Sequence, residues 1–367
     1  MITRKAKFPS LLKNVYFKKN NPVSLIHFLT NRCNARCSFC FIDFNNPKTF
    51  AGELTLGEID RLTKNLGNSL MNVNFTGGEP FARKEISEIA KLYIKNSTIQ
   101  SIYITTNGSL PDRVSAFAKE ISDYNKDIEL NFQISIDDLP DRHNKVRKVK
   151  NIFQDAVKTY NVLNNFKNPK IIPNVSITVT HENCANIQEI FYYLVHDCNI
   201  ESLKCCIVRD EGVYKTPEEK RDKILNAYDW LTNKIIEFQK EKKLKNYGNS
   251  IQGKVHNKKD EISWEIVKKT YKNNNYVSPC HASSLFGVIT PDGNVYPCEI
   301  LEDKLIGNLR DHDMNFMNLW NSTKNSEIKK FIKDTKCRCT YECALSFNIL
   351  GNWRYQHRLI AGLFTKY

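Results

Sequence analysis

Three cysteines close together near the N-terminus are the residues of this chain best suited to chemistry. Cys33, Cys37 and Cys40 follow the apolar run 25–29 with the spacing C-x3-C-x2-C. Thiolates are preferred ligands of iron–sulfur clusters, and three on one loop can hold three irons of a four-iron cluster. A closed site needs four ligands, so such a loop leaves one iron open. The triplet predicts a catalytic iron–sulfur site, with structural zinc or inert cysteines as the alternatives.

Disulfide bonds fit the rest of the sequence poorly. Disulfide frameworks are typical of small secreted proteins, whereas this chain has 367 residues and its first residues, 1–7, lack the apolar core of a signal peptide. Twelve cysteines in such a chain indicate a reducing compartment, with thiols available for metal. We therefore expect a cytoplasmic protein. Because no run of about 18 apolar residues occurs, we expect no membrane span.

Polar and glycine-rich motifs follow the cysteines in order, each directly after a strand-like run. The run 71–75 alternates and leads into Gly-Gly-Glu-Pro, and similar runs precede Thr-Thr-Asn-Gly and Ser-Ile-Asp. The residues concerned are Phe39, Gly77, Gly78, Glu79, Pro80, Asn107, Ser135 and Asp137. Gly-Gly-Glu-Pro alone can be a simple turn. In this order after the cysteine triplet, the set resembles the radical S-adenosylmethionine (SAM) superfamily over residues 23–215.

This resemblance implies a reaction and a set of SAM contacts. SAM would bind the open iron, and one electron, from a donor such as flavodoxin or ferredoxin, would cleave it to methionine and a 5′-deoxyadenosyl radical. That radical would take a hydrogen atom from the substrate. The backbone of Gly77 and Gly78 would approach SAM closely. Glu79 would accept from its ammonium group, and Phe39 would lie beside its adenine. Candidate contacts of the ribose or carboxylate are Asn107, Ser135 and Asp137.

Two arginines complete the SAM site that the resemblance implies. Arg209 ends the sixth strand-like run and would pair with the SAM carboxylate. Arg147 closes the segment His143-Asn-Lys-Val-Arg147, which resembles the family's His-Asp-x-x-Arg element. Asn144 replaces the aspartate of that element in this chain.

Two neighbouring cysteines in the sixth strand-like run allow two interpretations. Buried free cysteine usually packs as a small apolar residue, and this is the main interpretation of Cys205 and Cys206. Side chains alternate along a strand, so counting back from Arg209 places Cys205 on the same inward face. There it would donate a hydrogen atom to a substrate radical.

Strand-like and helix-like segments alternate along the N-terminal half. The strand candidates are 24–29, 71–75, 101–105, 130–136, 174–180 and 202–208, and the helix candidates between them are 55–66, 84–95, 112–122, 151–164 and 186–196. Thr55-Leu-Gly-Glu58 fits a capping box at the first helix. Repeated strand–helix units predict a parallel sheet with right-handed crossovers. Six such units make an α/β fold, a partial (β/α)6 TIM-like barrel, with the motifs at the carboxyl ends of its strands.

Four regions describe the expected domain organisation. They are an N-terminal extension (1–22), the partial barrel (23–215), a helical linker (216–275) and a small α+β cysteine-rich domain (276–367). In the linker, 216–243 reads as an amphipathic helix that begins at Thr216, and the Lys- and Asn-rich remainder as a loop with a short helix at 262–271. Since only 22 residues precede the barrel, we expect no N-terminal peptide-recognition domain.

A second set of cysteines lies in the C-terminal region. Its members are Cys280, Cys298, Cys337, Cys339 and Cys343, with a hairpin signal at 291–294 between the first two. The pattern resembles the SPASM/twitch extension of the same superfamily, which holds auxiliary four-iron clusters. Five cysteines suffice for one auxiliary cluster. Cys280, Cys298 and Cys343 are the firmer ligands, Cys337 or Cys339 would be the fourth, and structural zinc is the alternative.

Charge and motifs together narrow the function. The formal net charge is +14, but lysines are scattered and no nucleic-acid module is evident, so we expect no nucleic-acid partner. Part of the charge could serve an anionic substrate. We expect a radical SAM oxidoreductase that oxidises a sugar or other small metabolite by two electrons. A maturase of ribosomally made peptides, and a radical epimerase using Cys205, are the alternatives, and a non-catalytic iron–sulfur carrier fits the SAM motifs less well.

Overall fold

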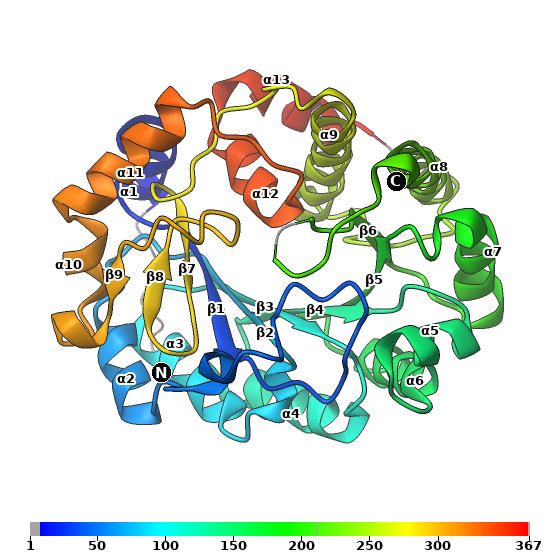
Figure 1. Cartoon of the computed structure of the whole chain (residues 1–367), viewed down its shortest axis with the longest axis horizontal. Helices are drawn as coiled ribbons and strands as arrows, with labels where there is room; N and C mark the ends of the chain where they lie inside the picture. The colour runs from blue at the N-terminus through cyan, green and yellow to red at the C-terminus, as the bar shows by residue number, and fades with distance from the viewer. Residues whose placement is uncertain (1–7, 211, 366–367) are drawn as a thin grey trace.

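A single curved sheet organises the molecule. The computed structural model describes residues 8–210 and 212–365, so residues 1–7 of the expected N-terminal extension lie outside the described part. The strands are β1 (Ser24–Thr30), β2 (Asn72–Gly77), β3 (Ser101–Thr106), β4 (Glu129–Ser135), β5 (Ile171–Val179), β6 (Leu203–Ile207), β7 (Phe286–Ile289), β8 (Asn294–Tyr296) and β9 (Gly307–Asn308). Among the described residues they form one nine-stranded sheet in the order β6-β5-β4-β3-β2-β1-β7-β8-β9 (Figure 1).

The first six strands form the predicted partial barrel. Each pairs in parallel with the next, and the predicted and observed strand ends agree to within three residues. The helices between them lie along the outer face: α2 (Leu56–Lys64), α3 (Ile86–Asn96), α4 (Pro111–Tyr124), α5 (Pro140–Arg147), α6 (Ile152–Asn164) and α7 (Ile187–Tyr192). The predicted capping box is present, because Thr55 and Glu58 bond each other's backbone N–H. The sheet stays open, and the fold class is confirmed.

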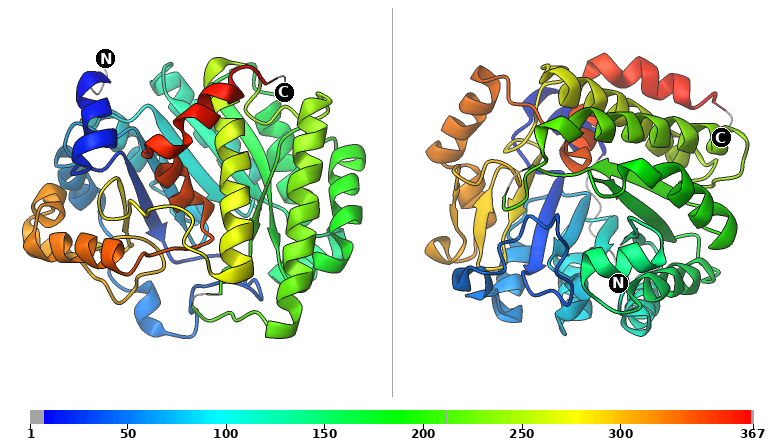
Figure 2. Two further views of the ribbon diagram at one scale, coloured as in Figure 1. Left: turned by 90° about the horizontal axis from the view of Figure 1, so that it is seen from above. Right: turned by 45° about the vertical axis from the view of Figure 1, so that its right-hand side comes forward.

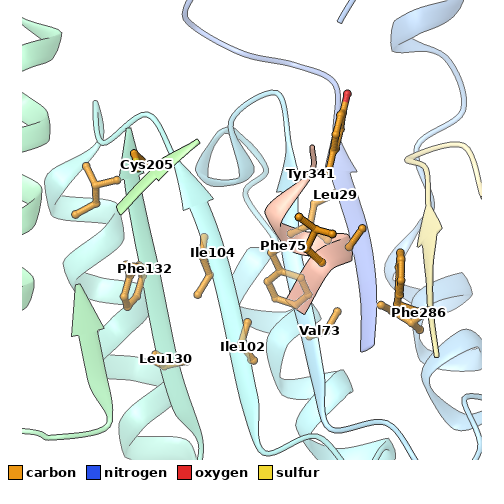
Figure 3. Packing of buried hydrophobic residues seen from close by; sticks show 14 of the residues in the cluster. Leu29, Val73, Phe75, Ile102, Ile104, Leu130, Phe132, Cys205, Phe286 and Tyr341 are labelled. Carbon is orange, nitrogen blue, oxygen red and sulfur yellow. The ribbon is translucent and has the colours of Figure 1, made fainter. Parts of the chain in front are cut away.

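The two faces of the barrel strands differ sharply in polarity. The outer face packs apolar side chains against the helices, among them Val73, Phe75, Ile102, Ile104, Leu130 and Phe132 (Figure 3). Ile177 and Leu203 belong to the same buried cluster. The alternate positions face the barrel interior and are polar: Asn72, Asn74, Tyr103, Thr105, Gln133, Ser135, Ser176, Thr178 and Lys204. Closed TIM barrels usually fill this interior with branched apolar residues. A polar interior is instead suited to hold a polar molecule.

The region expected to be a linker contains two long helices. They are α8 (Arg221–Lys240) and α9 (Ile251–Asn273), and α9 begins at Ser250, whose side chain accepts from the N–H of Gly253. The helix predicted at 216–243 is observed to within three residues at each end, as a 3₁₀ turn at Glu218–Lys220 that leads into α8, but Thr216 does not cap it. Helix α9 packs against α8 and α12 (Glu342–Leu350) and stands across the open side of the sheet (Figure 2). The expected short helix is therefore a wall of the barrel.

The C-terminal region continues the barrel sheet. Strand β7 pairs in parallel with β1, and β7 and β8 form the predicted hairpin. The helices that follow are α10 (Phe316–Trp320), α11 (Thr323–Asp334), α12 and α13 (Trp353–Gly362). In the described part of the chain, no helix combines the length and the apolar character needed to cross a membrane.

Candidate active site

The first cysteine loop, residues 31–43, leaves the carboxyl end of β1. The last carbonyls of α5 hold its backbone, since the N–H of Arg36 donates to Arg147 O at 3.0 Å and that of Ser38 to Val146 O at 3.3 Å. The thiol of Cys33 accepts from the N–H of its neighbour Ala35 at 3.3 Å. The loop is thus fixed at both its strand and its helix contacts.

The Gly-Gly-Glu-Pro motif packs directly against this loop. Gly77 has φ 126°, and a Cβ there would lie 2.0 Å from Thr30 O, while a Cβ on Gly78 would lie 2.3 Å from Arg32 O. The N–H of Gly78 donates to Thr30 O at 2.8 Å. The cysteine loop itself therefore demands both glycines. Their predicted contact with SAM stays a prediction, and Gly77 also lines the cavity described below.

Glu79 is buried and fully engaged within the protein. Its carboxylate accepts from Phe81 N at 3.1 Å, Thr106 Oγ1 at 2.8 Å and Asn107 N at 2.7 Å. Burial raises the pKa of Glu79, although these hydrogen bonds oppose the rise. The carboxylate ties the ends of β2 and β3 together and does not line the cavity. The predicted contact of Glu79 with the SAM ammonium stays a prediction, while Pro80 begins the buried turn that follows.

Arg147 and Asp137 form a buried ion pair beside the cysteines. Arg147 Nη2 lies 2.5 Å from Asp137 Oδ2, and the N–H of Thr178 donates to Asp137 Oδ1 at 2.8 Å. Burial opposes ionisation of Asp137, but the nearby charge of Arg147 and these hydrogen bonds bring its pKa below the usual value. Asp137 thus pairs with Arg147, and its predicted contact with the ribose or carboxylate of SAM stays a prediction. Asn144, where the family has aspartate, accepts from the N–H of Phe153 and links α5 to α6.

The first cysteine loop opens onto a large cavity. The cavity holds about 370 Å³, and its wall near the loop consists of Cys37, Phe39, Cys40, Gly77, Ser135 and Arg147. Burial raises the pKa of Cys40 to about 11, and the charge of Arg147 opposes this. Asn107 instead turns toward the loop, with Nδ2 2.8 Å from Asn34 Oδ1 and 3.8 Å from Cys33 Sγ. The positive charge of Arg147 would compensate part of the negative charge of thiolates that hold an iron–sulfur cluster here.

The second cysteine set lines a separate, much smaller pocket. All five members, Cys280, Cys298, Cys337, Cys339 and Cys343, border a space of about 10 Å³ closed by apolar side chains such as Ile26 and Phe286. A hydrogen bond from the Cys280 thiol lowers the pKa of Cys337 to about 7. Among the described residues, no group of three or more His, Cys, Asp or Glu side chains lies close enough together to hold a single metal ion. Cys343 borders both this pocket and the large cavity.

Arg209 lies between the two cysteine sets. Its Nη1 is 3.1 Å from Glu299 Oε2, and its guanidinium stacks 4.0 Å from the ring centroid of Tyr341 and 5.5 Å from that of Phe41. Phe41 follows Cys40, and Tyr341 lies two residues before Cys343. Arg209 lines the cavity, so its predicted contact with the SAM carboxylate stays a prediction, although Glu299 already neutralises it.

Cys205 packs in the structure as its main interpretation expects, whereas Cys206 lies on the inner face of β6. Cys205 lies in register with Ile177, is 3% exposed and packs in the apolar core (Figure 3). Cys206 pairs with Thr178 on the inner face, and its thiol donates to Thr178 Oγ1 at 3.5 Å. Counting back from Arg209 failed because β6 ends at Ile207, so the alternation does not reach the arginine. Cys205 also borders the large cavity, and its hydrogen-donor role stays a prediction.

Sequence reasoning missed the part of the cavity wall that α9 supplies. Its inward residues are His256, Lys259, Asp260, Ser263 and Trp264. They recur three or four positions apart, which is the spacing of one helix face. The helical spacing of these residues was present in the sequence, but most of them are polar rather than apolar. The surrounding Lys and Asn residues suggested a loop.

Family comparisons agree with this arrangement. A model of the radical SAM superfamily matches residues 28–191, and a model of the SPASM iron–sulfur cluster-binding domain matches residues 276–344. The chain therefore contains a radical SAM domain followed by a SPASM domain. Its two domains imply SAM, a radical SAM four-iron cluster and auxiliary iron–sulfur binding, and each contains one of the two cysteine sets. These are the types of cofactor that the sequence predicted for this radical SAM enzyme, and the prediction is confirmed.

The proteins that resemble this radical SAM chain align with different portions of it. Fe-coproporphyrin III synthase of Methanosarcina barkeri is 29% identical over 187 residues, 50% of this chain and 43% of that protein. Sporulation killing factor maturation protein SkfB of Bacillus subtilis is 22% identical over 325 residues, 86% of this chain and 69% of that protein. The solved structure of native anSMEcpe with bound AdoMet and Kp18Cys peptide aligns at 20% identity with a TM-score of 0.58, covering 86% of each chain. The alignment thus spans less than half of the first relative, and the structural likeness shows the fold.

Proposed function

We propose that this radical SAM enzyme oxidises a peptide by two electrons. The observation that carries the proposal is that a second cavity neighbours the cavity at the cysteine loop. A second cavity of about 390 Å³ opens at the amino ends of the strands, and it shares five lining residues with the cavity at the cysteine loop: Asn72, Tyr103, His256, Phe347 and Leu350. Two neighbouring cavities of this size, which share part of their lining, suit an extended chain better than the compact sugar or small metabolite that the sequence analysis put first.

The comparisons support the same choice of substrate. SkfB, which aligns with most of this chain, is a maturation protein for a killing factor, and the anSMEcpe structure contains a peptide. The polar lining of the barrel also suits peptide backbone, because its amide and hydroxyl side chains can pair with exposed N–H and C=O groups.

The described residues divide the work between two sites. Cys33, Cys37 and Cys40 would hold the first cluster, with Arg147 compensating thiolate charge beside them. When bound, that cluster and SAM supply the radical that removes a hydrogen atom from the peptide. Loss of a proton and of one further electron completes a two-electron oxidation, and the second cysteine set adjoins the cavity at Cys343 to receive that electron. A donor such as flavodoxin or ferredoxin would reduce the first cluster.

The test uses short peptides encoded beside the gene. The reconstituted protein, SAM and dithionite should convert such a peptide into a product two mass units lighter and release 5′-deoxyadenosine in proportion. Oxidation of a nucleotide sugar under the same conditions, with every peptide unchanged, would contradict the proposal. Deuterium entering the product from deuterated water at an inverted carbon would indicate epimerisation instead.

A further inference from the structure

A buried charged cluster lines the cavity on the side of α9. Lys259 Nζ lies 2.8 Å from Asp260 Oδ1, and Lys204 Nζ of β6 lies 3.8 Å from Asp260 Oδ2. The Lys259 side chain is only 8% exposed and also donates to Ser346 Oγ at 3.2 Å. Lys204 also bonds the hydroxyl of Tyr247. Two ammonium groups therefore share one carboxylate within a confined space.

Taken by itself, the cluster carries an excess positive charge. Two lysines and one aspartate sum to +1. The two arginines that line this cavity each have a carboxylate partner, since Arg147 pairs with Asp137 and Arg209 pairs with Glu299. Glu342, a further carboxylate that lines the cavity, accepts from the hydroxyl of Tyr228 and forms no ion pair among the described residues. Burying an excess charge is costly unless a counter-charge joins it.

Unsatisfied polar atoms lie on the same face of α9. The hydroxyl of Ser263 is buried at 2% exposure, lines the cavity and has no hydrogen-bond partner among the described residues. His256 Nδ1, three residues before Lys259, is likewise buried and without a partner in that part of the chain. Buried polar groups are normally satisfied, so these atoms indicate a bound molecule.

We infer that Lys204, Lys259 and Ser263 form a subsite for a carboxylate of the substrate. One negative charge matches the excess of +1, and a carboxylate has enough lone pairs to accept from both ammonium groups and the hydroxyl. The inference deepens the proposed function and rests on it for the peptide character of the substrate. The carboxylate belongs either to an acidic side chain or to the peptide C-terminus.

Four pools of randomised hexapeptides distinguish these sources. The pools carry Glu or Gln at one fixed central position, each with a free or an amidated C-terminus. The reconstituted protein with SAM is dialysed against each pool, and retained peptides are counted by mass spectrometry. We expect about tenfold greater retention of a carboxylate-bearing pool over the amidated Gln pool, a modest value for a charge-assisted hydrogen bond. Preference for the amidated Glu pool identifies a side chain, and preference for the free Gln pool identifies the C-terminus.

Charge-matched variants test the residues. Lys259→Gln removes the excess charge and should abolish the preference, whereas Lys259→Gln with Asp260→Asn returns the cluster to +1 through Lys204 and should restore it. Ser263→Ala changes no charge and should weaken retention about threefold, as loss of one hydrogen bond does. Lys269→Gln, on the exposed side of the same helix, is the control and should change nothing.

Each contradicting outcome has a separate meaning. Equal retention of all four pools by the unaltered protein overturns the carboxylate subsite and leaves the peptide proposal standing. Retention of none overturns both. A double variant as indifferent as Lys259→Gln, with folding verified by iron content, would show that excess charge is not the basis of recognition.

Discussion

The two cysteine sets differ in what surrounds them. Three thiols at Cys33, Cys37 and Cys40 lie on a loop that opens onto a cavity of about 370 Å³, whereas the five C-terminal thiols surround a space of about 10 Å³ closed by apolar side chains. A cluster held by three thiols beside a large cavity has room for an exchangeable ligand. A cluster held by four of the five C-terminal thiols has none. The same chemical group would therefore react at one site and exchange electrons at the other.

Removing the first set should have the largest effect. Changing Cys33, Cys37 and Cys40 to Ala should reduce iron from about eight to about four per chain, because each cluster holds four irons. SAM cleavage should fall to background. Iron analysis and 5′-deoxyadenosine assays check this, and complete loss of iron would show that the two sites are not independent.

Removing the second set should separate cleavage from turnover. A variant with Cys280→Ala and Cys298→Ala should still release 5′-deoxyadenosine with dithionite, because the first cysteine loop keeps its contacts. It should not oxidise a peptide. The assignment of SAM cleavage to the first cysteine set alone would be wrong if the folded variant retained its first cluster yet failed to cleave SAM.

A substitution of Arg209 tests whether its contacts between the two cysteine sets stabilise the second set. Arg209→Met should leave Glu299, whose side chain is 9% exposed, without its cation. We expect a loss of about 2 kcal/mol in the free energy of unfolding, less than for a fully buried pair, and weaker iron retention at the second set. Arg221→Met is the matched control, since Arg221 is equally exposed and pairs with Asp210 at 3.0 Å. Equal iron loss in both variants would contradict the link.

The smallest effect concerns a contact between the barrel and the C-terminal region. Arg310 donates to both oxygens of Glu58, at 2.6 and 3.1 Å, and this hydrogen bonding lowers the pKa of Glu58 to about 2. A lowered pKa stabilises the folded state above the unfolded value, and this stability disappears as pH falls through the folded value. Glu58→Gln should therefore cost about 1 kcal/mol at neutral pH. Urea unfolding should show the difference shrinking as pH falls from about 4.5 toward 2, and a constant difference would argue against the ion pair.

The sequence predicted the parts of the molecule that depend on local patterns. Alternation located six strands, and Thr55 with Glu58 marked the first helix because capping is a contact within one turn. The engagement of Glu79 with β3 was invisible, since it joins residues far apart in the chain. Helix α9 was shortened to 262–271 because its inward face is polar. Apolar periodicity marks helices that face a core, and this one faces a cavity.

The open iron of the first cluster is the central claim, and electron paramagnetic resonance tests it most directly. The Cys280→Ala, Cys298→Ala variant isolates the first cysteine set, so its reduced spectrum reports on that cluster alone. We predict that adding SAM changes the g-values of this signal, because SAM would bind the iron that the three thiols leave free. A spectrum unchanged at saturating SAM would show that the site is closed and would contradict the account.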